Sequence, residues 1–393
     1  MTRISTSGAR PTGLTTLLLA GLGAALIGVT VAAAVALQRL SNDGYVATHL
    51  VHGLLYGLGV AIILRRPLGR SGLLVILAVA LALRLIALLV PPTLTTDAFR
   101  YVWDGRVQAA GINPYLYVPA DERLAHLRDD AIYPNINRKE THPTIYPPVA
   151  EMAFLLGTRL TNSIRGQQIV MLAFDLVTIG ALVLWLTASG LPRERVAIYA
   201  WHPLTVWEFA GMAHIDSVAV AGLTLACLAG ARGRQVLAGI ALAAAGLVKY
   251  HYLLFLPALW RRWHWGVGLA MAVTVVALYA PYLSAGTKLA GSLVTHLGEE
   301  GYQDGYGFYL VGMPRHLGLP YLAPAVFAGL AALALGAAGL AAMLRPNPQE
   351  ISPSWLIGLG ALFLVLVSPH YPWYYTMVLP LLCRRVSLPL LWI

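Results

Sequence analysis

Residues 73–106 read LLVILAVALALRLIALLVPPTLTTDAFRYVWDGR, and this stretch decides the fold. Its first half belongs to an apolar run over residues 72–90, which has the length of a helix that crosses the hydrocarbon core of a bilayer. Its second half mixes acids with arginines. Ionisable residues gathered at the end of a membrane span are a functional hypothesis by default. The stretch therefore predicts an integral membrane protein with reactive side chains at the membrane surface.

The composition of the whole chain agrees with this interpretation. Apolar residues make up 58% and charged residues only 11% of 393 residues, and the mean hydropathy is +0.69. These values exclude a soluble globular domain. The net charge of +10 lies mostly in short loops, so membrane topology and anionic lipid headgroups explain it better than a nucleic-acid partner does. The two cysteines, Cys227 and Cys383, have no metal-ligand or disulfide spacing.

Apolar segments recur along residues 1–393, which we interpret as a single integral membrane domain. The predicted fold is all-α, a polytopic transmembrane bundle of about 10–13 helices. The segments are residues 13–37, 45–64, 72–90, 167–186, 196–211, 217–230, 236–248, 252–260, 265–283, 321–344, 355–367 and 373–382. The first is expected to be a retained helix, because it is too long for the core of a signal peptide. The pair around Lys249 is expected to form a broken or re-entrant hairpin, since a lysine in the middle of a helix is costly in lipid. Asp175 is expected to pair with a neighbouring helix.

Arginines predict the orientation of these helices. With the N-terminus in the cytoplasm, the arginine clusters all return to the cytoplasmic side, as the positive-inside rule requires. They are Arg65, Arg66 and Arg70, Arg193 and Arg195, Arg232 and Arg234, Arg261 and Arg262, Arg345, and Arg384 and Arg385. We therefore expect a multi-pass protein of the plasma (inner) membrane. Its two long loops, residues 91–166 and 284–320, then face the extracytoplasmic side and are expected to carry amphipathic juxtamembrane helices.

Residues at the start of the first long loop suggest a catalytic base. If this stretch is helical, Asp97, Arg100, Tyr101 and Asp104 share one face. A carboxylate close to the end of a membrane helix can take a proton from an acceptor at the lipid–water boundary. The alternative interpretation is that these residues only cap the start of a helix and lie on its solvent-exposed face. The competing acids are Asp129 and Asp130, which lie farther from any predicted helix end.

Four more groups of polar residues fall on the same predicted side. Tyr146 lies in a rigid turn between Thr144 and Pro148 that could line a sugar pocket or could simply fold the loop. His214 and Asp216 could orient an acceptor, with a helix-end cap as the alternative.

Lys249 and His251 lie at the tip of the suspected hairpin, and His370, Tyr371 and Trp373 lie between two apolar segments. Fixed cations in a dry site would neutralise a phosphate leaving group. For Lys249 the alternative is that its amine reaches the membrane surface.

Signals for other functions are missing from the sequence. It has no Gly-rich phosphate loop with a lysine, so ATP-driven transport has no support. Every predicted cytoplasmic loop is too short for a nucleotide-sugar domain, and an activated donor used outside the membrane is then expected to arrive on a lipid. The alternative function is a transporter or flippase of lipid-linked sugars, which should carry charges at the bilayer midplane in two related halves.

Several motifs in order along the chain resemble the GT-C glycosyltransferases, integral membrane enzymes that use polyprenyl-phosphate sugars. They are Asp97–Arg106, Gly111-Ile112-Asn113-Pro114-Tyr115, Tyr146-Pro147-Pro148, Trp201-His202-Pro203-Leu204, Ala213-His214-Ile215-Asp216, Lys249-Tyr250 and Pro369-His370-Tyr371-Pro372-Trp373-Tyr374. The chain is most similar to the bacterial mannosyltransferase branch. One departure is that three apolar segments precede the loop, where the family usually has one. Either helices were added at the N-terminus or the assignment of Asp97 to the catalytic loop is wrong.

The resemblance implies a reaction and the residues that perform it. A hexosyltransferase, with mannose as the expected sugar, would move the sugar from a polyprenyl-phosphate donor to a lipid or glycan acceptor by an inverting single displacement. Asp97 would be the general base, and Arg100, Lys249 and His370 would hold the donor phosphate. The sugar and acceptor candidates are Tyr101, Asp104, Arg106, Tyr146, His214, Asp216, His251, Tyr371 and Trp373. No cofactor or metal site is required, although the outer acids could bind Mg²⁺ or Mn²⁺. We expect a monomer surrounded by membrane lipids.

Overall fold

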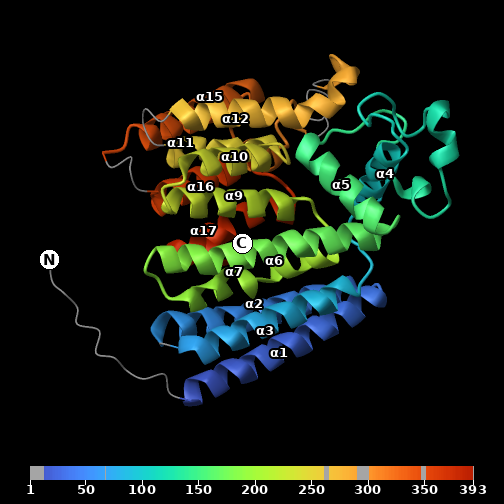
Figure 1. Ribbon diagram of the computed structural model, residues 1–393. Coiled ribbons are helices and arrows are strands. Elements are labelled where there is room, and N and C mark those ends of the chain that lie inside the picture. Colours follow the sequence, from blue (N-terminus) through green and yellow to red (C-terminus); the bar gives the residue numbers. More distant parts are fainter. Residues whose placement is uncertain (1–12, 67, 261–264, 290–300, 347–350, 393) are drawn as a thin grey trace.

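A computed structural model describes residues 13–66, 68–260, 265–289, 301–346 and 351–392. These residues form a bundle of helices and contain no strand, so the predicted all-α fold is confirmed (Figure 1). Arg261 and Arg262 of the predicted cytoplasmic row lie outside the described residues, as does part of the second long loop.

Six helices in the described chain are long and apolar enough to cross a membrane. They are α1 (Gly13–Gln38), α2 (Asn42–Arg65), α3 (Gly69–Leu88), α6 (Ile164–Ala188), α12 (Trp265–Tyr279) with its continuation to Ala285, and α15 (Pro324–Met343). Each lies within a few residues of a predicted segment. The chain is therefore a polytopic membrane protein.

The remaining apolar segments are short or broken. The short helices are α9 (Asp216–Ala231), α10 (Gln235–Gly246), η5 (Tyr250–Phe255) with α11 (Leu256–Leu259), α16 (Pro353–Val367), and η7 (Pro372–Val378) with α17 (Leu379–Arg384). The single segment predicted over residues 196–211 is four pieces: η3 (Arg193–Val196), α7 (Ala197–Ala200), α8 (Pro203–Thr205) and the π-helical turn η4 (Val206–Gly211). Pro203, which has no N–H to continue a helix from α7, begins α8.

A buried ion pair lies inside the bundle. The Arg84 guanidinium of α3 pairs with the Asp175 carboxylate of α6, and both side chains are fully buried. Tyr199 of α7 donates its hydroxyl to Asp175 Oδ1 at 2.7 Å, and Arg84 Nη1 donates to the Ala200 carbonyl at 2.6 Å. The expected pairing of Asp175 with a neighbouring helix is confirmed. The pair joins three segments where α7 ends.

The first long loop folds into a compact unit at one end of the bundle (Figure 1). Its helices α4 (Asp97–Ala109) and α5 (Pro148–Leu160) pack against each other, with the short turns η1 (Glu122–Leu127) and η2 (Tyr133–Asn135) between them. A small apolar core holds the unit together, made of Val102, Trp103, Val107, Leu124, Ile132 and Ile136. We call this side of the molecule the loop end.

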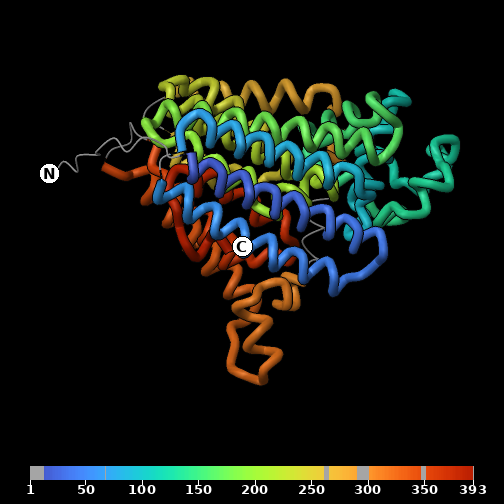
Figure 2. Tube along the Cα trace, turned by 90° about the horizontal axis from the view of Figure 1, so that it is seen from below, coloured from blue at the N-terminus to red at the C-terminus, as the bar shows by residue number. Residues whose placement is uncertain are grey.

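The second long loop contributes α14 (Tyr309–His316). This helix and α15, in orange, stand out from the side of the bundle in Figure 2.

Arginines flank the opposite end. Helix α3 runs from Gly69 towards α4, so Arg66 and Arg70 lie where α3 starts, away from the loop end. Helix α6 follows α5 and ends before Arg193. These arginines therefore lie at the end of the bundle opposite the folded loop.

Candidate active site

One cavity of about 870 Å³ opens at the loop end of the bundle. Its walls come from the start of α4, the turn before α5, the connection from α10 to η5, and the connection from α16 to η7. Eight of the residues predicted from the sequence line it: Asp97, Arg100, Tyr146, Lys249, His251, His370, Tyr371 and Trp373. Residues as far apart in the chain as Asp97 and Trp373 are thus brought to one place.

Asp97 is the first residue of α4 and is half-buried at the cavity wall. Its backbone N–H donates to Thr95 Oγ1 at 3.1 Å, which fixes the start of the helix. Its carboxylate Oδ1 accepts a hydrogen bond from the Asn137 amide at 3.0 Å. Within the described residues, Asp97 forms no ion pair. The carboxylate is held in place without being neutralised.

Arg100 lies one turn further along α4 and is 5% exposed. Its Nε donates to both oxygens of Asp104, at 2.9 and 3.0 Å, and its Nη1 donates to the His142 carbonyl at 3.2 Å. The shared helix face predicted from spacing is present, but only Asp97 and Arg100 reach the cavity. Asp104 lies behind Arg100 and orients it.

A second buried acid stands next to this pair. Glu151 of α5 is fully buried and accepts hydrogen bonds from Thr144 Oγ1 at 2.5 Å and from Gln108 Nε2 at 2.8 Å. Burial raises the pKa of Asp104 above its ordinary value, although Arg100 opposes the shift. Burial and the nearby Asp104 charge hold the pKa of Glu151 well above its ordinary value, so the neutral form of Glu151 is favoured.

Lys249 stands where the predicted hairpin breaks. Helix α10 ends at Gly246, and Lys249 has an extended backbone before η5 starts. Its ammonium donates to Asp216 Oδ2 at 2.7 Å, and Asp216, the first residue of α9, is completely buried. The ammonium also lies 4.6 Å from the centre of the Tyr374 ring. A buried carboxylate thus holds Lys249, as another holds Arg100.

His214 does not line the cavity but supports its wall. It is buried, its ring stacks on Trp373 with centroids 3.8 Å apart, and its Nδ1 lies 2.7 Å from Glu208 Oε2. We predicted that His214 and Asp216 act together. The structure instead places His214 with Glu208 of η4 and Asp216 with Lys249.

The connection between α16 and η7 supplies the exposed rim. His370 stacks on the Tyr309 ring of α14 at 5.0 Å, and Tyr371 stacks on Trp373 at 4.6 Å. Ser368, which precedes them, has a left-handed backbone (φ 50°) that turns the chain out of α16. Both His370 and Tyr371 are exposed.

Two further predicted residues, Tyr101 and Arg106, also lie outside the cavity. Tyr101 is fully buried behind Tyr146, whose ring meets it edge-on at 5.4 Å. Arg106 points into the folded loop, where it pairs with Asp129 at 2.9 Å and donates to Asn162 Oδ1 at 3.0 Å. Arg106 therefore fastens the loop. The competing acids Asp129 and Asp130 do not line the cavity.

A metal site finds no support in the described part of the chain, where no group of three or more His, Cys, Asp or Glu side chains could hold an ion. Binding of Mg²⁺ or Mn²⁺ stays an expectation that no observation tests.

Several residues of the site were not predicted from the sequence. Asn137, Thr144, Glu151 and Tyr302 come from irregular loop or from α5, and their contacts depend on how the loop folds. Glu151 did carry a signal: it is an acid in the first turn of a helix whose middle, residues 152–157, is apolar.

Comparison with known families identifies the chain. A family described as "Alpha-(1->6)-mannopyranosyltransferase, N-terminal domain" (the MptA_B family) matches residues 10–265. The chain belongs to this family. The match includes Asp97, Arg100, Asp216 and Lys249, and it supports glycosyltransferase activity. No curated protein matches the chain, and no solved structure does.

Proposed function

We propose that the protein transfers mannose from a polyprenyl-phosphate donor to an extracytoplasmic lipid or glycan acceptor, with Asp97 as general base. One observation carries the proposal: the same cavity holds the Asp97 carboxylate, which has no cationic partner among the described residues, together with Arg100, Lys249 and His370. Family membership supports the sugar. The arginines at the opposite end support an extracytoplasmic position for the cavity.

The reaction is a single displacement. The acceptor hydroxyl gives its proton to Asp97, and its oxygen forms a bond to the anomeric carbon. The bond from this carbon to the phosphate oxygen breaks, the electron pair leaves with the polyprenyl phosphate, and the anomeric configuration inverts. The base must lie opposite the leaving group, so Asp97 and the phosphate are expected on different sides of the sugar.

Arg100 and Lys249 are suited to hold the phosphate. A guanidinium has five N–H donors and an ammonium has three, so donors remain after the bonds to Asp104, His142 and Asp216. Because buried carboxylates fix both cations, little reorganisation is needed as negative charge develops on the leaving oxygen. His370 at the rim would add a third contact.

Apolar residues beside these cations favour a lipid donor. Leu94, Val248, Phe363 and Val367 line the same cavity. An isoprenoid chain could lie along them while its phosphate meets Arg100 and Lys249. A water-soluble nucleotide sugar would leave this surface uncovered.

The test is mannosyl transfer by purified protein in liposomes. We expect transfer from radiolabelled polyprenyl phosphate β-mannose to an α(1→6)-mannoside and an α-linked product. The α-anomer of the donor and a nucleotide-linked mannose should be inactive. Transfer from the nucleotide sugar alone, or a β-linked product from the β-donor, would contradict the proposal.

A further inference from the structure

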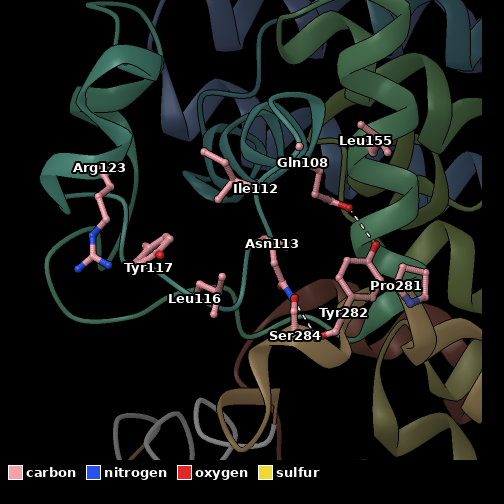
Figure 3. Close-up of a pocket in the computed structure, with 12 residues that line it drawn as sticks. Gln108, Ile112, Asn113, Leu116, Tyr117, Arg123, Leu155, Pro281, Tyr282 and Ser284 are labelled. Atoms are coloured by element: carbon pink, nitrogen blue, oxygen red, sulfur yellow. Dashed lines mark hydrogen bonds between the residues drawn. The ribbon is translucent and has the colours of Figure 1, made fainter.

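A second cavity, of about 640 Å³, lies between the folded loop and the end of the α12 helix (Figure 3). Gln108 of the last turn of α4 and Asn113 of the following turn form one wall. Tyr282 and Ser284, from the end of the α12 helix, form the second, and Tyr117 with Arg123 forms the third. None of the residues assigned above to the displacement reaction lines it.

Hydrogen bonds fix the polar groups of this cavity before any ligand binds. Asn113 Nδ2 donates to the Tyr282 carbonyl at 2.9 Å and to Ser284 Oγ at 2.8 Å, and its Oδ1 accepts from the Tyr115 N–H at 3.2 Å. The Tyr282 hydroxyl donates to Gln108 Oε1 at 2.9 Å. Fixed walls lower the entropic cost of binding.

Two hydroxyl groups of this cavity can still form a hydrogen bond to a ligand, one as a donor and one as an acceptor. Ser284 accepts from Asn113 and keeps its own O–H to donate, while the Tyr282 oxygen donates and keeps lone pairs to accept. Tyr117 adds an aromatic ring under Arg123, whose guanidinium carbon lies 4.3 Å from the ring centroid.

This chemistry selects a neutral polyhydroxyl ligand. The one cation among the described lining residues, Arg123, is already paired with Asp121 at 3.0 Å. The Lys288 ammonium beside Tyr117 donates to the Leu116 carbonyl at 2.9 Å, so both cations already have partners. A sugar offers hydroxyls that donate and accept together with C–H faces that pack on an aromatic ring.

Helix α4 connects this cavity to the proposed base. Asp97 begins the helix and Gln108 lies eleven residues further on, which places them about 16 Å apart along the axis. This separation exceeds one sugar ring but suits a short oligosaccharide.

On these grounds, and resting on the proposed function, we infer that the second cavity is a distal acceptor subsite. It would bind a mannosyl unit several residues from the accepting hydroxyl, so the preferred acceptor is an already extended glycan.

The experiment compares short and long acceptors. With polyprenyl phosphate mannose as donor, the KM and kcat of wild-type protein are measured for an α(1→6)-linked mannobiose and for the corresponding mannohexaose. We expect Tyr117→Ala to raise KM for the hexaose about tenfold and to leave kcat/KM for the biose within twofold. Arg123→Ala, at a side chain that is 67% exposed, should act in the same direction and guards against misfolding of the first variant.

Tyr306→Ala is the matched control. Tyr306 is another half-exposed loop tyrosine under an arginine, with Arg315 4.5 Å from its ring centroid, and it lines neither cavity. This variant should behave as wild type with both acceptors.

A binding titration without donor separates the two proposals. Mannohexaose should bind wild-type protein about tenfold more tightly than Tyr117→Ala. Equal KM for both acceptors in the wild type, equal loss with both acceptors in Tyr117→Ala, or equal hexaose binding by the two proteins would each overturn the subsite. Absence of transfer to any mannoside would instead refute the proposed function, and the titration would still decide whether the cavity binds the glycan.

Discussion

Replacing Lys249 separates a structural role from a catalytic one. The ammonium lies 2.7 Å from Asp216, whose carboxylate is completely buried. Lys249→Gln therefore leaves a buried carboxylate unpaired, and removal of one partner of such a pair costs about 3–5 kcal/mol of folding free energy. The same change removes a charged hydrogen bond to the donor phosphate, worth about 1.5–3 kcal/mol. This predicts a loss of about 10- to 150-fold in kcat/KM beyond any effect of unfolding.

The double variant Lys249→Gln/Asp216→Asn distinguishes the loss of stability from the loss of activity. Two amides can bond to each other and bury no net charge, so most of the lost stability should return. Catalysis should not return, because the cation is still missing. Asp216→Asn alone keeps the ammonium, and we expect it to lose stability but less activity than Lys249→Gln.

The assay is mannosyl transfer in liposomes beside the thermal unfolding midpoint of each purified protein in detergent. We expect the double variant to have an unfolding midpoint near that of the wild type and mannosyl transfer reduced at least tenfold. Recovery of both stability and transfer would refute a phosphate-binding role for Lys249 and leave it only as the partner of Asp216.

Two further changes test the buried charges. The folded state raises the pKa of Glu151 above its ordinary value of 4.5, so the folded protein holds a proton that the unfolded chain releases, and stability falls as pH rises from about 4.5 towards the folded pKa. Glu151→Gln removes this dependence, so its free energy of unfolding relative to wild type should increase between pH 5 and pH 8, by up to about 1.4 kcal/mol per pH unit. A difference that does not change with pH would contradict the shift. Arg84→Met leaves Asp175 unpaired inside the bundle and should lower the free energy of unfolding in detergent by about 3–5 kcal/mol. Arg66→Met, at an exposed site, should leave it unchanged. Equal unfolding midpoints for the two variants would show that the buried pair is dispensable.

Hydropathy predicted the helices because each long apolar run has to satisfy its backbone inside lipid. Segments such as 13–37 and 167–186 therefore match α1 and α6 closely. The prediction was wrong where local chemistry breaks the helix, as between α7 and the π-helical turn before His214. A hydropathy average taken over the whole segment does not detect such a break, which only Pro203 marks in the sequence.

For the candidate site, the positions of polar residues at the ends of the apolar segments predicted which side chains meet in the cavity. They did not predict which of these side chains pair with each other. Asp97, Arg100 and Lys249 do share the cavity. The partner of Lys249 could not be assigned, because Asp216 meets it only when separate helices pack. Arg100 instead pairs within α4 with Asp104, four residues further on. Arg106 shows the opposite error, since its position in the motif suggested ligand binding while the folded loop uses it for Asp129.

The central claim is that Asp97 is the catalytic base. The measurement that tests it most directly is kcat for mannosyl transfer by Asp97→Asn, compared with Asp130→Asn as a loop acid outside the cavity. General base catalysis contributes about 10²–10⁴-fold, so kcat of Asp97→Asn should fall by that factor while donor KM stays within a few-fold and Asp130→Asn stays within twofold of wild type. A kcat of Asp97→Asn within tenfold of wild type, or an equal fall in Asp130→Asn, would contradict the assignment.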